Sequence, residues 1–185
     1  MKKTVLTFGL ISGAIISVMM LATVPFQEQI GVDKGEVIGY TTMILSFMLV
    51  YFGVRSYRDN VRGGRITFGR AFAVGTLITA LSCVCYVATW EVIYHNFMPD
   101  FAEKYASAQI QKVKASGASQ QAIDRQMAEM KKFQTMYRNP FFNVAMTFVE
   151  PLPVGLVIAL VSAGVLSRKP RPPVLASSTS PVVSH

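Results

Sequence analysis

The sequence is poor in charge and in cysteine. Only 15% of its 185 residues are Asp, Glu, Lys or Arg, whereas 51% are hydrophobic. Soluble domains carry about a quarter charged residues, so this composition argues against an ordinary soluble domain. Disorder is excluded over most of the chain, because so much apolar surface must be buried or lie in lipid. The two cysteines, Cys83 and Cys85, are too few for a disulfide framework or a structural zinc site.

Four long apolar runs predict membrane spans. Residues 4–24, 37–54 and 71–90 contain no charge, and residues 141–166 contain one, Glu150. About 20 apolar residues cross the hydrocarbon core as a helix, and runs this long do not fit the alternating strands of a membrane barrel. We therefore predict an all-α, four-helix transmembrane bundle over residues 1–169. Its parts are spans at 4–24, 37–54, 71–95 and 141–166, an outer helical insert at 99–138, and a disordered cytoplasmic tail at 170–185.

The distribution of Lys and Arg predicts the orientation. The first three residues, 55–70 and 167–185 together hold 10 Lys and Arg and one acid. Residues 25–36 and 91–140, on the other side, hold 8 Lys and Arg and 8 acids. Because Lys and Arg near span ends accumulate in the cytoplasm, both termini are expected there, in a bacterial inner (cytoplasmic) membrane. A signal peptide ending near Pro25 is the alternative, but the run is long and no small-x-small cleavage site precedes Pro25.

The loop between spans two and three is rich in arginine. We interpret it as a topology anchor that meets anionic lipid headgroups, and an anion or partner site is the alternative. No basic-aromatic recognition module is present, so nucleic acid is not an expected partner. The five anchor residues are Arg55, Arg58, Arg62, Arg65 and Arg70.

The insert predicts two amphipathic helices joined at Gly117 and Ser119, which suit a C-cap and an N-cap. Apolar residues then recur at helical spacing in the second helix. Such a hairpin can cap the bundle, lie on the membrane surface or hold a partner, and we favour the cap. The candidate interaction stripe consists of Ile123, Met127, Met130, Phe133 and Tyr137.

Small residues recur every fourth position in three spans. They allow close helix packing, either within one bundle, which we favour, or in a homo-oligomer. The three sets are Gly9, Gly13 and Ser17; Ala71, Gly75, Thr79 and Cys83; and Gly155, Ala159 and Ala163.

Glu150 is the one charge inside a span, and two interpretations remain open. A carboxylate deep in lipid is costly, and Pro151 and Pro153 leave nearby backbone carbonyls unpaired, so a cation or a proton can bind there. If the span instead begins near Pro151, Glu150 lies at the outer interface beside a helix N-terminus, which favours an anion.

Glu91 and His95 lie four residues apart on one face at the outer end of the third span. They can converge with Glu150 in an outward-facing polar patch, but they are too few for a zinc site, and His95 fits an interfacial position. No catalytic motif is present, so we predict a non-enzymatic protein without a cofactor or metal.

Several motifs resemble one family in their order and spacing. They are YFGVRSYR at 51–58, RITFGRAF at 65–72, MPDF at 98–101, NPFF at 139–142 and FVEPLPVG at 148–155. Over residues 3–169 the chain resembles the bacterial membrane proteins called domain of unknown function 4199. The resemblance implies a four-helix membrane protein and marks 150–155 as a shared feature, and it implies no activity.

Together these patterns predict an accessory or scaffolding subunit. It would bind a membrane or periplasmic protein partner through the outer hairpin. The alternative is a small ion- or proton-coupled transporter or channel component that uses Glu150 and requires a homo-oligomer. A third hypothesis is binding of envelope lipid by the hairpin.

Overall fold

The structure, a computed structural model, describes residues 1–168, except for the side chains of residues 27, 28, 32 and 33. The tail predicted at 170–185 lies outside the described residues. Over the described part the chain forms helices and connecting turns, with no strand. The helices are α1 (Lys2–Thr23), the 3-10 helix η1 (Val24–Phe26), α2 (Gln27–Val61), α3 (Phe68–Asn96), α4 (Phe101–Ala115), α5 (Gln120–Tyr137), α6 (Pro140–Val149) and α7 (Leu152–Leu166).

The predicted all-α class is confirmed. Four segments are long and apolar enough to cross a membrane: Lys2–Phe26, Lys34–Val61, Phe68–Asn96 and Pro140–Leu166. The chain thus has the helices of a multi-pass membrane protein. Two spans extend beyond their charge-free runs, because arginine is a good helix former and its long stem lets the charge reach the interface.

The arginine-rich loop is consequently shorter than the sequence suggests. Its first seven residues continue α2, Arg70 lies in the first turn of α3, and only residues 62–67 connect the two helices. The turn falls at Gly63 and Gly64, whose φ angles of 63° and 83° suit glycine. The Gly64 amide closes the turn by donating to the Arg58 carbonyl at 2.9 Å.

Small residues on α1 bring it close to α3. Gly9 faces Leu81 and Gly13 faces Cys85, so that a methyl group added at Gly13 would lie 2.6 Å from the Cys85 Cβ. One turn further along, the Thr89 hydroxyl donates to the Ser17 hydroxyl at 2.7 Å. The order of these contacts shows that α1 and α3 run parallel, as the first and third spans must.

Small residues also join α3 to α7. Gly75 faces Ala159 and Gly155 faces Thr79, an order that makes these helices antiparallel. The α1–α3 and α3–α7 contacts place the small residues inside one bundle. This agrees with the favoured interpretation that these residues pack helices within a single chain. The stripes are therefore occupied within a single chain.

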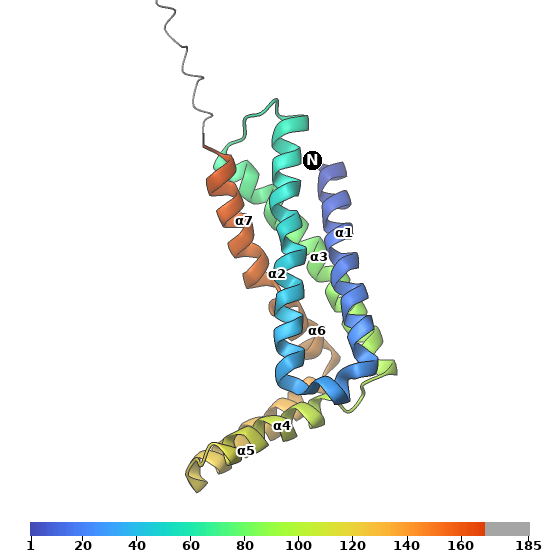
Figure 1. Ribbon diagram of the computed structural model, residues 1–185, viewed down its shortest axis with the longest axis vertical. Coiled ribbons are helices and arrows are strands. Elements are labelled where there is room, and N and C mark those ends of the chain that lie inside the picture. The colour runs from blue at the N-terminus through green and yellow to red at the C-terminus, as the bar shows by residue number, and fades with distance from the viewer. Residues whose placement is uncertain (169–185) are drawn as a thin grey trace, which may run out of the picture.

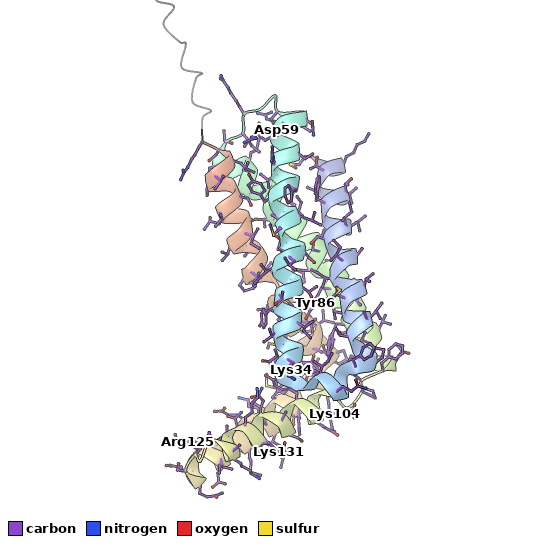
Figure 2. All side chains as sticks on the ribbon, viewed as in Figure 1. Lys34, Asp59, Tyr86, Lys104, Arg125 and Lys131 are labelled. Carbon is purple, nitrogen blue, oxygen red and sulfur yellow. The ribbon has the colours of Figure 1, made fainter. Side chains whose placement is uncertain are left out.

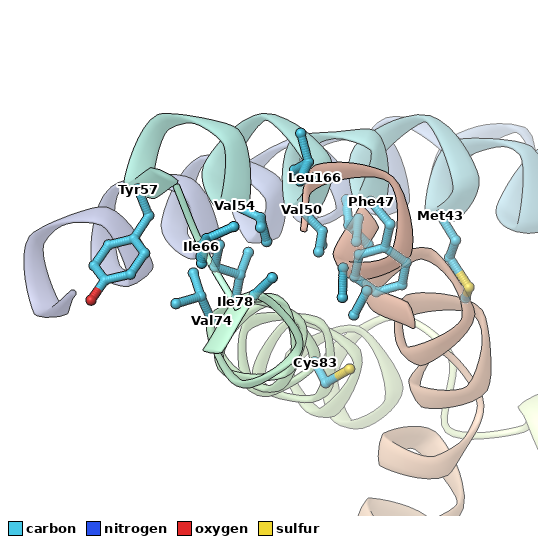
Figure 3. Packing of buried hydrophobic residues seen from close by; sticks show 14 of the residues in the cluster. Met43, Phe47, Val50, Val54, Tyr57, Ile66, Val74, Ile78, Cys83 and Leu166 are labelled. Carbon is cyan, nitrogen blue, oxygen red and sulfur yellow. The ribbon is translucent and has the colours of Figure 1, made fainter. Parts of the chain in front are cut away.

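The two ends of the bundle differ (Figure 1). The N-terminus, the 62–67 connection and the end of α7 lie at one end, which we call the arginine end. The core nearest this end is filled by fully buried side chains of α2 and α3 (Figure 3), namely Phe47, Val50, Val54, Val74 and Ile78. At the other end α4 and α5 pack side by side and project from the bundle at an angle.

Candidate functional site

The α4–α5 pair is attached to the bundle by an aromatic cluster at its base. The Trp90 ring of α3 meets Phe101 of α4 edge-on, with ring centroids 4.7 Å apart. The Trp90 indole N–H donates to the Tyr137 hydroxyl at 2.9 Å and to Asn143 Oδ1 at 3.2 Å. Burial raises the pKa of the Tyr137 phenol to about 12. One tryptophan thus links α3, α4, α5 and α6.

The predicted interaction stripe divides into two parts. Tyr137 is buried and Phe133 is half-buried, and the Phe133 ring lies 5.6 Å from that of Tyr105. Further from the bundle, Met127 remains 47% exposed, with Ile123 and Met130 half-buried beside it. The pair touches the bundle at its base and does not cover the bundle end along its length (Figure 1), because only its basal residues are large and aromatic.

Local sequence signals set the ends of the helices in this region. Gly117 adopts a φ of 71° after α4, and the Ser119 hydroxyl caps α5 by accepting from the Ala122 amide. Asn139 Oδ1 accepts from the Phe141 amide at 2.9 Å and so caps α6, whose first residue is Pro140. The segment that closes the insert therefore begins the fourth span directly.

The fourth span is broken at Glu150 and Pro151. α6 ends at Val149 and α7 begins at Leu152, and both halves are helical. Glu150 therefore belongs neither to an unbroken helix nor to an irregular interfacial segment. Pro151 is fully buried, whereas Pro153, the second residue of α7, is exposed.

The Glu150 carboxylate faces α3. The buried Tyr86 hydroxyl donates to Glu150 Oε2 at 2.9 Å, while the Glu150 side chain remains accessible. Tyr86 lies 18 residues from the start of α3 and 10 from its end, at the level labelled in Figure 2. The carboxylate thus lies in the α4–α5 half of the bundle, about one helical turn from the aromatic cluster toward the arginine end.

A cavity of about 200 Å³ opens in front of this carboxylate, between α1, α2, α3, α4 and α6. We call it the Glu150 cavity. It is lined by Ile16, Met19, Met20, Thr23, Ile30, Gly31, Gly35, Glu36, Ile38, Gly39, Tyr40, Thr42, Met43, Tyr86, Trp90, Phe101, Tyr105, Thr147 and Glu150.

A groove of about 420 Å³ adjoins the cavity. It is lined by residues of α2, α4, α5 and the end of α6, among them Glu36, Tyr137 and Met146. The groove and the cavity share Glu36, Tyr40, Phe101, Tyr105, Thr147 and Glu150. The cavity is therefore continuous with a groove at the base of the α4–α5 pair.

The other predicted polar residues lie apart from this cavity. Neither Glu91 nor His95 lines it, and the convergence with Glu150 does not occur. Glu91 is five residues beyond Tyr86, about 140° around α3, and so points to another face. His95 Nδ1 instead lies 2.9 Å from the Glu91 carbonyl and 3.5 Å from Glu91 Oε2. Among the described residues no group of three or more His, Cys, Asp or Glu can hold a metal.

The predicted anchor arginines gather at the arginine end. Arg58 is half-buried, and its Nε donates to Asp59 Oδ1 at 2.7 Å. The other four, Arg55, Arg62, Arg65 and Arg70, are exposed.

Sequence analysis missed the partner of Glu150. Tyr86, Trp90 and Tyr94 are spaced four residues apart and therefore share one face of α3. The candidate residues predicted from the sequence did not include Tyr86. The four-residue spacing of these aromatic residues indicates that α3 has an aromatic face, and that face lies against the fourth span.

Comparison with known proteins identifies a family. The family described as "Protein of unknown function (DUF4199)" matches residues 7–168, and the chain belongs to it. No curated protein and no solved structure gives a significant match.

Proposed function

We propose that this chain is a non-enzymatic accessory or scaffolding protein of a bacterial inner membrane. It holds a membrane or periplasmic protein partner at the far end of the α4–α5 pair. The arginine end, with both termini, faces the cytoplasm, and the α4–α5 pair lies outside. The charge distribution supports this orientation, because the arginine end carries the excess of Lys and Arg.

One observation carries the proposal. The α4–α5 pair projects from the bundle, and of its stripe only Phe133 and Tyr137 join the aromatic cluster at the base. Met127 is 47% exposed between half-buried Ile123 and Met130, on a helix that is otherwise charged. A partly exposed apolar stripe on a projecting helix is the arrangement that helix-recognising partners use.

The test is a pair of methionine substitutions. We expect Met127→Gln to reduce the recovery of the partner severalfold when tagged protein is purified from its native membrane in lipid nanodiscs. Met136→Gln is the matched control, since Met136 is also exposed but lies about 180° around α5. Partner recovery is measured by quantitative mass spectrometry. Equal loss in both variants, or in neither, contradicts docking at the stripe.

The use of Glu150 in ion or proton transfer stays an untested alternative. Its support is the accessible carboxylate beside Tyr86. Toward the arginine end, however, the bundle is filled by buried Phe47, Val50 and Ile78. A route through one copy of this chain would therefore require these side chains to move.

A further inference from the structure

We propose that the Glu150 cavity binds an organic ammonium group attached to an apolar body. The inference goes beyond the partner-binding proposal and does not depend on it. It rests on the charge, the aromatic lining and the shape of the cavity.

The charge of the cavity selects a cation. Two carboxylates, Glu150 and Glu36, line both the cavity and the adjoining groove. Although the chain has a net charge of +8, no Lys, Arg or His is among the described residues that line the cavity or the groove. Tyr86 holds one Glu150 oxygen in place by donating to it at 2.9 Å. A cation that enters the cavity therefore meets two acids and no basic side chain.

The lining selects an organic cation over a metal ion. Five aromatic side chains surround the carboxylates: Tyr40, Tyr86, Trp90, Phe101 and Tyr105. Aromatic faces attract alkylammonium ions and form the cages that bind quaternary ammonium ligands. A hard metal ion requires several oxygen ligands instead, and no group of three acids, His or Cys able to hold a metal occurs in the described chain.

The shape of the cavity admits an apolar body. Gly31, Gly35 and Gly39 line the α2 wall, and a methyl group added at Gly39 would meet no atom within 4 Å. An apolar cavity of about 150 Å³ accommodates benzene, so about 200 Å³ holds a trimethylammonium group with part of an alkyl chain. The adjoining groove gives such a chain a way out of the cavity.

Trp90 provides a built-in reporter, since it lines the cavity and is the single tryptophan of the chain. The full-length protein in phosphatidylglycerol nanodiscs is titrated with hexyltrimethylammonium, and Trp90 fluorescence is recorded. We expect a saturable change. Hexanol, which has the same chain without charge, and hexyl sulfate, which reverses the charge, are expected to produce none. A response to hexanol as strong as that to the ammonium ion would overturn the proposal.

Glu150→Gln keeps an oxygen that accepts from Tyr86, so the fold is expected to survive. It removes the charge, and the affinity for hexyltrimethylammonium should fall roughly ten- to a hundredfold. Glu129→Gln, on the exposed surface of α5, is the matched control and should leave the affinity unchanged. Wild-type affinity in Glu150→Gln contradicts the proposal.

A second pair of variants tests the cavity itself. Gly39→Leu fills the cavity and should abolish the response, whereas Gly164→Leu, at a position equally free of neighbours but on α7 and outside the cavity, should retain it. Retained binding in Gly39→Leu would place the ligand elsewhere and overturn the assignment.

The natural source of the ammonium group is a free amine or a lipid headgroup. Repeating the titration in phosphatidylethanolamine nanodiscs separates the two. If the headgroup occupies the cavity, the apparent affinity for hexyltrimethylammonium falls in this lipid, and Glu150→Gln removes the difference between lipids. If the source is a free amine, the affinity is the same in both lipids.

Discussion

Gly155 of α7 packs directly against Thr79 of α3. A methyl group at this position would collide with the methyl of Thr79 and lie 2.9 Å from its hydroxyl oxygen. We expect Gly155→Ala to destabilise the protein by about 1–3 kcal/mol, because overpacking outweighs the gain of roughly 0.5–1 kcal/mol in helix propensity. Thermal unfolding in detergent, followed by circular dichroism, measures the effect.

Gly164 on the same helix is the control. No atom lies within 4 Å of a methyl group added there, so Gly164→Ala should be neutral or slightly stabilising. In the double variant with Thr79→Ser, which removes the colliding methyl, Gly155→Ala should cost less. Unfolding temperatures that fall equally in the two alanine variants would show that the α3–α7 contact is not the cause.

The sequence predicted a local feature correctly where the type of a single residue indicates that feature. Glu150 and the prolines beside it stand out in an apolar run, and Gly117 and Ser119 mark a helix end and a helix start. Tyr86 could not be assigned to Glu150, because their contact joins residues 64 positions apart. Tyrosine also has an ordinary place in a membrane helix, so its type alone gives no signal.

At the scale of the elements, Tyr137 ties α5 to the rest of the molecule. Burial raises its pKa from 10 to about 12, so folding favours the neutral phenol. The stability that this provides is fully present below pH 10 and is lost as the pH rises through about 12. We expect the Trp90 emission to shift to the red over this range as the aromatic cluster opens.

Tyr137→Phe removes the titrating group and should suppress most of this shift. It also removes the acceptor of the Trp90 indole N–H, so the cluster is expected to be weaker at neutral pH. Tyr57→Phe is the control, because Tyr57 is buried near the end of α2 that leads into the 62–67 connection, and it does not belong to the aromatic cluster. An unchanged red shift in Tyr137→Phe would assign it to another group.

Hydropathy predicted which segments form helices better than where those helices begin and end. The charge-free run of the second span stops at residue 54, but α2 continues to Val61 because arginine sustains a helix. The fourth span reads as one apolar run, yet it divides at Pro151, whose ring and missing N–H prevent the preceding helix from continuing. The sequence contains that proline, but the direction of α7 after it depends on packing against α3 and α2.

At the scale of the whole molecule, packing differs between the two ends. The arginine end is filled with aliphatic side chains of α2, α3 and α7, whereas the α4–α5 end contains the cavity and the groove. The sequence predicted the spans and their order along the chain. It did not predict the cavity, because a cavity depends on which faces of five helices meet and on the absence of side chains at Gly35 and Gly39.

The proposed orientation makes a prediction for the whole molecule. In a protein with Cys83→Ala and Cys85→Ala, single cysteines are placed at two exposed sites, Arg62→Cys at the arginine end and Lys131→Cys on α5. A membrane-impermeant maleimide added to intact bacteria should label Lys131→Cys, and it should label Arg62→Cys only after lysis. The physical reason is that the arginine end holds most of the excess positive charge, which is retained on the cytoplasmic side during insertion. The reverse pattern would invert the orientation, and labelling of both sites from outside would contradict a single membrane crossing by α3 between them.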